Sequence, residues 1–362
     1  MKSNNCNKTG YGLVSVIMSV YNADPDLLKR SVDSILNQTY SDIELILIND
    51  GAGEKGEEYI KSLKDKRVHV LVNPRNMGLA FSLNRGIKAA HGTYIARMDA
   101  DDYALPERLS EQLSYMEEHK NIDVLACITA DICEGKLTGK LGGLYKKFNN
   151  EDMRIQFSLS PMPFPHPSVI FRTDFLKSNN LAYDEEYERA QDYNMWARCI
   201  EHGTLDSIQR VLLYYDIGNG QGNGPSDKQI YYSNKTKLMC LERLLPDADE
   251  EIKNLYIHMR DMEMTGSVED NISLVYQLIN ANRQKRLYDP VRYSRILYFW
   301  WARKVLYASN RQYLFVFLKK PAFVINMIKA FMCEMPWHVQ QRLYERKSTD
   351  DFKRMISNEE KA

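Results

Sequence analysis

Short apolar runs alternate with helical patterns through the first third of the chain. Between the runs, apolar residues recur at three- and four-residue spacing, as in Leu28, Val32 and Ile35 after the helix-starting pair Asp24-Pro25. Strands separated by helices predict right-handed crossovers onto a mostly parallel sheet, so we expect a doubly wound α/β domain. The runs with the length and β-branched content of buried strands are residues 13–20, 43–49, 67–72, 93–98 and 122–128.

The pattern changes after residue 150. Residues 161–172 are broken by prolines and then extended, and residues 190–203 predict a helix that ends at Gly203. A glycine-rich loop over residues 218–227 precedes a helical half of the chain. The predicted parts are a polar tail over residues 1–11, the α/β domain over residues 12–228 and a helical region over residues 229–362.

Polar side chains follow three of the predicted strands. They are Asp50, the segment Asn73 to Asn76, and the segment Asp99 to Asp102. The carboxyl ends of parallel strands meet at one edge of a sheet, where doubly wound domains bind their ligands. The three polar groups therefore predict a single binding crevice.

Three carboxylates, Asp99, Asp101 and Asp102, crowd into four positions at one of these strand ends. Like charges at such spacing repel one another unless a positive group lies between them. A hard divalent cation, Mg²⁺ or Mn²⁺, suits oxygen ligands and keeps positions open for phosphates. An EF-hand is excluded because Ala104 and Ser110 stand where its loop needs Gly and Glu. A solvated acidic loop or a helix N-cap is the alternative.

Motifs in a fixed order carry a family resemblance. The chain contains "VSVIMSVYNADPDLLKRSVDSILNQTYSDIELILINDGA", "NPRNMGLAFSLNRGI", "GTYIARMDADD", "HPSVIFR" and "AQDYNMWAR". This order resembles family-2 glycosyltransferases of the GT-A fold over about residues 12–215. The resemblance implies an inverting, metal-dependent transferase that uses a nucleotide-diphosphate sugar, with a UDP-hexose or UDP-N-acetylhexosamine as the expected donor. It also implies a role in building a bacterial surface polysaccharide, such as a lipid-linked O-antigen or capsule repeat.

The resemblance also implies roles for individual residues. In the "SVYN" stretch, Ser19 and Tyr21 match donor-binding positions, with Tyr21 packed against the base. Asp50 matches a residue that hydrogen-bonds the base, and Asn76 and Gly78 match an "NxG" element that lines the nucleotide.

The metal and catalytic positions follow from the same motifs. Asp99 and Asp101 match the DxD pair, which holds the ribose and, through Mn²⁺ or Mg²⁺, the diphosphate. Asp192 matches the catalytic base, and Gln191 stands where the family has an acid. One carboxylate base opposite the leaving group gives in-line displacement and inversion. An acidic residue in the first turn of a helix is the structural alternative for Asp192.

Four residues depart from the family pattern or leave its meaning open. Asp216 and Gly218 stand where a "YRxH" stretch would supply Arg and His. Either Asp216 or water completes the metal sphere, or the glycine loop orders on donor binding, or the loop is a linker. His166 matches a recurring element and is either structural or in contact with donor or acceptor. Arg97 is a candidate structural partner of the carboxylates.

Composition adds the distribution of charge. The formal net charge is zero, yet residues 281–349 hold 14 Lys or Arg against 3 Asp or Glu, whereas residues 1–280 hold 31 against 41. The six cysteines show no metal-site spacing, which favours thiols in a reducing compartment. The N-terminus lacks the apolar core of a signal peptide. We expect a protein of the cytoplasm or of the cytoplasmic face of the inner membrane.

Residues 291–333 interleave aromatic residues with cations, and Trp300, Trp301 and Trp337 lie in or just after this segment. Basic amphipathic helices of this kind bind anionic membranes peripherally, which would suit a lipid-linked glycan acceptor. A helical region that packs its own core is the alternative. No recognised module supports nucleic-acid binding.

Two rival functions remain open on the sequence alone. A nucleotidyltransferase has a similar fold and metal site, but it would be expected to carry a glycine-rich basic loop where this chain has "SVYNADPD". A catalytically silent nucleotide-sugar-binding protein would keep the fold without turnover.

Overall fold

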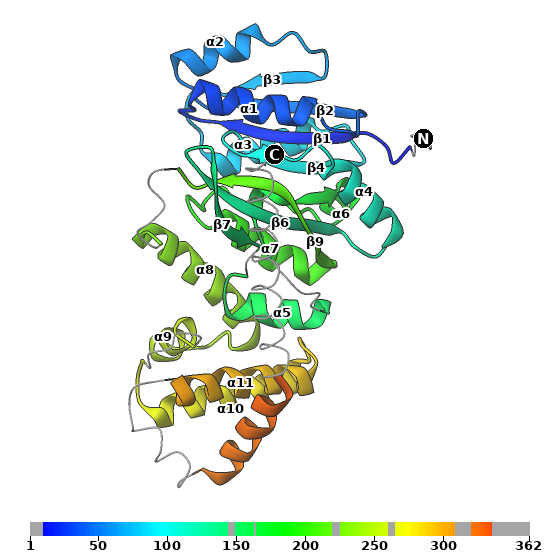
Figure 1. Cartoon of the computed structure of the whole chain (residues 1–362). Coiled ribbons are helices and arrows are strands. Elements are labelled where there is room, and N and C mark those ends of the chain that lie inside the picture. The colour runs from blue at the N-terminus through cyan, green and yellow to red at the C-terminus, as the bar shows by residue number, and fades with distance from the viewer. Residues whose placement is uncertain are drawn as a thin grey trace. The chain divides into compact units, whose positions relative to one another are not determined.

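The computed structural model describes residues 10–143, 149–162, 164–218, 225–259, 265–307 and 320–334 (Figure 1). These residues form two compact units. The first unit takes its members from Met1–Leu144, Phe164–Glu185 and Gly203–Gln221. The second takes them from Tyr145–Pro163, Glu186–His202 and Gly222–Ala362, so two of its segments precede residue 228.

A mixed sheet forms the first unit, in the order β3-β2-β1-β4-β8-β6-β9-β5, with β7 paired to β6. Strands β1 to β4 are mutually parallel where they pair, and β6 is parallel to β9. The strands are β1 Val14–Val20, β2 Ile43–Asn49, β3 Val68–Val72, β4 Tyr94–Asp99, β5 Tyr103–Ala104, β6 Val124–Cys133, β7 Lys136–Gly142, β8 Ile170–Arg172 and β9 Leu205–Asp216.

Helices cover both faces of this sheet, as a doubly wound domain requires. Leu28 and Val32 of α1 share a core cluster with Val16 and Met18, which lie on one face of β1. On α3, a Cβ added to Gly86 would stand 2.5 Å from Ile17, a residue of the opposite face. The helices are α1 Pro25–Leu36, α2 Glu54–Ser62, α3 Leu79–Ala89, α4 Arg108–Glu118 and α6 Thr173–Ser178, and a short 3₁₀ turn covers His166–Ser168.

The predicted fold class is confirmed, and the five predicted strands are present. The sheet is more mixed than simple strand–helix alternation predicts, because β8 lies between β4 and β6 and pairs antiparallel with both. Strand β9 was not predicted, since its buried positions follow no regular alternation. Its register with β6 shifts between Cys127 and Thr129, where Gln209, Arg210 and Leu212 are the extra residues, so the irregularity lies on β9 itself.

The second unit is helical and has its own core. Ile155, Leu241, Leu278 and Phe299 belong to one buried apolar cluster. Glu201 accepts from both Arg154 and Arg243 inside this unit. The helices are α5 Asn150–Leu159, α7 Gln191–His202, α8 Asp227–Leu244, α9 Glu250–Ile257, α10 Val268–Lys285, α11 Pro290–Tyr307 and a further helix over residues 321–334.

Helix α11 packs inside this core. Trp300 and Trp301 are only 7% and 4% exposed, and Tyr293 is fully buried. For this helix, the structure therefore supports the alternative of a helical region with its own core, because its tryptophans are already covered by protein. Trp337 lies outside the described residues. None of the helices in the described ranges combines the length and apolarity that crossing a bilayer requires.

Candidate functional site

The carboxyl ends of β1, β2 and β4 bring the predicted donor-binding residues to one edge of the first unit. Ser19 of β1 is the register partner of Asp99 at the end of β4. Tyr21 follows β1 directly, and Asp50 follows β2. Residues that are far apart in sequence thus share this edge because three neighbouring strands run in the same direction.

Asp50 ties the loop after β3 to the sheet. Its carboxylate accepts from the side-chain nitrogen of Asn73 at 2.6 Å and from the backbone nitrogens of Met77 and Gly78 at 2.7 and 3.0 Å. Asn76 also accepts from the Gly78 nitrogen, at 3.0 Å. Asp50 is only 1% exposed, so its carboxylate fixes the "NxG" element from inside. Its predicted bond to the base stays a prediction.

Tyr21 presents an exposed ring beside a glycine. Its side chain is 60% exposed, and a Cβ added to Gly51 would lie 3.5 Å from the ring. Gly51 has a φ of 104°, a conformation that other residues rarely adopt. The side-chain oxygen of Asn49 accepts from the nitrogens of Gly51 and Ala52 and holds this turn. The result is a firm turn with a flat, accessible ring above it.

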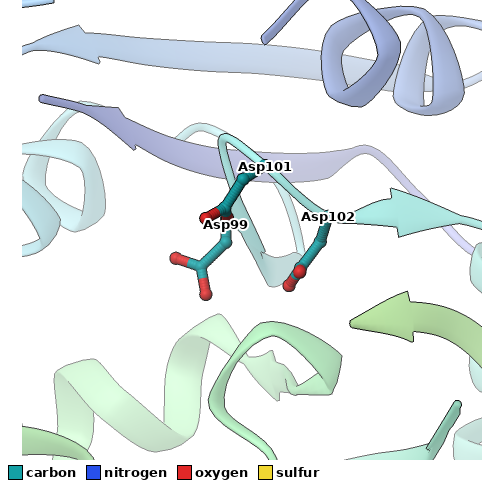
Figure 2. Close-up of side chains that lie close together, drawn as sticks. All are labelled: Asp99, Asp101 and Asp102. Atoms are coloured by element: carbon teal, nitrogen blue, oxygen red, sulfur yellow. The ribbon is translucent and has the colours of Figure 1, made fainter. Parts of the chain in front are cut away.

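The three carboxylates lie together at the end of β4. Asp99 is the last residue of β4, and Asp101 and Asp102 lie in the turn before β5. Figure 2 shows that the three side chains point to the same side of this turn. One oxygen from each of Asp99, Asp101 and Asp102 lies within 4.8 Å of the other two. Arg97, which is buried, forms an ion pair with Asp99. Arg97 is thus a direct partner of the cluster, as the sequence suggested.

The guanidinium of Arg97 alone does not neutralise the negative charge of the three carboxylates. Loss of solvation and the Asp99 charge raise the pKa of Asp101 to about 6, although Asp101 reaches solvent. Burial, with Asp99 and Asp101 nearby, raises the pKa of Asp102 well above its usual range. The buried Oδ2 of Asp102 has no hydrogen-bond partner among the residues that the structure describes. These oxygens fit a hard divalent cation such as Mn²⁺ or Mg²⁺.

The raised pKa of Asp101 predicts a pH-dependent response to metal. Its pKa of about 6 in the folded state exceeds the usual value of 3.8, so the protonated carboxyl stabilises the metal-free fold. That contribution is fully present below pH 3.8 and is lost as the pH rises through 6. Metal binding needs the ionised form. The rise in Tm on adding Mg²⁺ should therefore grow from about pH 5 to about pH 7.5, as differential scanning fluorimetry would measure. The same slope in Asp101→Asn would contradict this assignment.

Arg30 of α1 is a site residue that sequence reasoning missed. Its Nη2 donates to the backbone oxygen of Asp101 at 2.5 Å and to the carboxylate of Asp216 at 2.9 Å. Asp216 also accepts from the Gly218 nitrogen, and its own nitrogen donates to Asp102 at 2.9 Å. Asp216 is therefore held by Arg30 and by the Gly218 nitrogen, and its part in a metal sphere stays a prediction. The signal that could have found Arg30 is weak, since 186 positions separate it from Asp216.

Removing the contacts of Arg30 should loosen the turn that carries Asp101 and Asp102. Arg30→Gln is expected to weaken Mg²⁺ binding about tenfold, because the turn that carries Asp101 loses the anchor on its backbone oxygen. In a double-mutant cycle, Asp216→Asn should add little on top of Arg30→Gln, since the two side chains act as a pair. Isothermal titration of metal in the presence of UDP would measure this. Fully additive effects would argue against the pairing.

Asp192 lies in the first turn of α7 and belongs to the second unit. Its carboxylate accepts from the backbone nitrogen of Tyr193 at 2.8 Å. Ala190, just before the helix, has a φ of 52°, a left-handed conformation that is uncommon for alanine. Gln191 is buried. Backbone strain next to the candidate base is typical of residues held for function.

His166 is a half-buried residue with an aromatic partner. Its Nε2 lies 2.8 Å from the hydroxyl of Tyr183. Burial, with a smaller effect from Arg97, lowers its pKa well below the usual range, so the ring is neutral. A neutral histidine that is bonded to a tyrosine favours the structural interpretation of this motif.

Comparisons with known proteins identify a family. The model of glycosyl transferase family 2 matches residues 15–177. An uncharacterized glycosyltransferase, MJ1057, of Methanocaldococcus jannaschii is 39% identical over 215 residues, covering 57% of this chain and 71% of that protein. The amylovoran biosynthesis glycosyltransferase AmsE of Erwinia amylovora is 30% identical over 215 residues, covering 58% of this chain and 79% of the relative.

Solved structures give the same fold. Residues 1–349 of TarS from S. aureus, in complex with UDP-GlcNAc, superpose with a TM-score of 0.54 at 20% sequence identity. The match covers 80% of this chain and 88% of that one. The same TarS fragment in complex with UDP gives a TM-score of 0.51.

Proposed function

The chain belongs to glycosyl transferase family 2, and from this we propose that it moves a hexose or N-acetylhexosamine from a UDP-sugar to a glycan hydroxyl with inversion. The observation that carries the proposal is the carboxylate cluster of Asp99, Asp101 and Asp102 at the sheet edge, beside the Tyr21 ring and the loop held by Asp50. An edge of this kind is where doubly wound domains bind nucleotides.

Each residue has one role in this proposal. Tyr21 packs against the uracil, while Ser19, Asp50, Asn76 and Gly78 shape the nucleotide site. Asp99 and Asp101 hold Mn²⁺ or Mg²⁺, which when bound supplies Lewis-acid stabilisation of the departing diphosphate.

Asp192 accepts the proton of the acceptor hydroxyl in this scheme. Its carboxylate removes the proton as the oxygen attacks the anomeric carbon. The bond from that carbon to the diphosphate breaks as the new glycosidic bond forms, and the nucleoside diphosphate leaves with the electron pair. One displacement gives inversion.

The substrate class is supported by relatives. TarS binds UDP-GlcNAc and UDP, which favours a UDP-sugar donor, and AmsE is named for amylovoran biosynthesis, which favours a polysaccharide acceptor. We propose an acceptor carried on a lipid at the cytoplasmic face of the inner membrane, in the synthesis of a surface polysaccharide.

The test is release of free nucleoside diphosphate from a panel of UDP-, GDP- and dTDP-sugars, each with Mn²⁺, with Mg²⁺ and with EDTA. We expect release from one UDP-sugar only when metal is present. Water serves as a slow acceptor, so the measurement works before the glycan acceptor is identified. Pyrophosphate formation from a nucleoside triphosphate and a sugar phosphate would instead indicate a nucleotidyltransferase. If nothing is released and UDP with Mn²⁺ does not raise the Tm, the proposal fails.

A further inference from the structure

The helix over residues 321–334 is apolar on two opposite faces. Its inward face contributes Phe323, Val324, Met327 and Ala330 to the core of the second unit. Tyr298 and Trp301 of α11 pack edge-on against Phe323, with ring centroids 5.2 and 5.7 Å away. The packing is ordinary for a helix that covers a core, and it fixes which side of the helix faces outward.

The outward face carries a second apolar stripe. Ile325, Ile328 and Met332 are 51%, 47% and 70% exposed. Their spacing of three and four residues places them along one line of the helix surface. A surface helix of a globular domain normally has polar side chains there. This exposed apolar stripe therefore indicates a binding surface.

Charge around the stripe indicates what the occupant is. Two lysines are exposed here: Lys329 lies on this helix, and Lys320 is the residue just before it. The single acid of residues 320–334, Glu334, forms an ion pair with Arg295 of α11 and does not offset them. The stripe is thus flanked by cations. It lies within residues 281–349, which hold 14 Lys or Arg against 3 Asp or Glu.

We propose that the outward face of this helix, which we call the 325–332 stripe (Ile325, Ile328 and Met332), docks on an anionic lipid surface. Interfacial helices insert an apolar face to the depth of the headgroup boundary while cations contact the headgroups. Three half-exposed side chains suit that contact. They expose far less than the roughly 800 Å² per partner that a stable protein dimer buries.

The contact differs from the one that aromatic content suggests, because Trp300 and Trp301 are buried, whereas this helix exposes a row of three apolar side chains together with cations. The inference deepens the proposed function, on which it rests for its biological meaning, since a lipid-linked acceptor lies at a membrane. Its test is independent of sugar transfer.

Flotation of the full-length protein with vesicles tests the proposal. We expect the wild type to float with phosphatidylcholine vesicles that contain phosphatidylglycerol, and to float weakly with phosphatidylcholine alone. The variant Ile325→Ser/Ile328→Ser/Met332→Ser should lose at least about tenfold in partitioning, because each buried methylene contributes about 0.8 kcal/mol. The variant Lys320→Glu/Lys329→Glu should lose binding to the anionic vesicles only.

The matched control is Ile230→Ser/Tyr231→Ser on α8, which removes side chains that are 45% and 64% exposed elsewhere on the same unit. It should float like the wild type. Equal flotation of the stripe variant and the wild type, or no flotation of the wild type, would overturn the proposal. A wild-type dimer that the stripe variant converts to a monomer in sedimentation would assign the stripe to a second copy of the chain instead. Nucleotide release measured without vesicles reports separately on the proposed function.

Discussion

Asp101→Asn is expected to lower kcat/KM for sugar transfer by about 10³-fold, a loss typical of removing one group that stabilises developing charge. Asparagine keeps the shape of the side chain and removes a ligand charge from the cluster. Titration calorimetry should show that UDP binds this variant equally with and without Mn²⁺. Nucleoside diphosphate release from the preferred donor measures the rate.

The same substitution should leave the metal-free fold at least as stable as the wild type. The pKa of Asp101 is raised to about 6 by lost solvation and by Asp99, so its ionised carboxylate destabilises the fold near neutral pH. Lower activity with an unchanged or higher Tm separates a site effect from unfolding. Asp33→Asn, which removes a surface carboxylate paired with Lys29, is the control and should retain activity. Normal metal-dependent activity in Asp101→Asn would show that the metal lies elsewhere.

Asp192→Asn is expected to lower kcat by about 10² to 10⁴-fold, the usual contribution of a positioned general base. The amide keeps the hydrogen-bonding size of the side chain but accepts no proton from the acceptor. Metal-dependent UDP binding should be unchanged, because none of the residues assigned to the nucleotide is altered. Steady-state kinetics with saturating donor would show the loss in kcat rather than in the KM for the donor.

Asp174→Asn provides the matched control for this variant. Asp174, like Asp192, is an acid in the first turn of a helix, but it lies outside the proposed site. If both variants lost only a little activity and a similar amount of stability, Asp192 would be a helix-terminal residue and nothing more. If Asp192→Asn also abolished UDP binding, its role would be structural.

The part of the site that lies at the ends of the parallel strands could be predicted from the local sequence pattern. The strands that end at Val20, Asn49 and Asp99 are short apolar runs with polar residues directly after them, and strand direction alone then brings Tyr21 and Asp50 together. The Arg30–Asp216 pair could not be predicted, because no periodicity links α1 with the end of β9. Pairing of that kind depends on which strands become neighbours.

The aromatic segment shows a second limit of prediction from pattern. Trp300 and the 325–332 stripe both lie in basic, amphipathic sequence, yet the structure buries the tryptophan and exposes the stripe. A helix that is apolar on one face has the same sequence pattern whether that face meets protein or lipid. The choice is made by the surrounding core, here by partners such as Phe323 that come from later in the chain.

The interleaved course of the chain has a consequence for exchanging parts between relatives. Ile155 and Leu159 of α5 are built into the core of the helical unit, and Tyr193 of α7 donates to the backbone oxygen of Phe157 at 2.8 Å. A chimera joined at residue 228 would import a helical region without α5, which supplies part of its core, and without α7, which is hydrogen-bonded to α5. A graft that included α5 and α7 would keep that core intact and would also transfer Asp192. Recombination that respects this grouping would then move the candidate proton acceptor together with the helical unit, while the proposed nucleotide-binding edge stayed with the sheet.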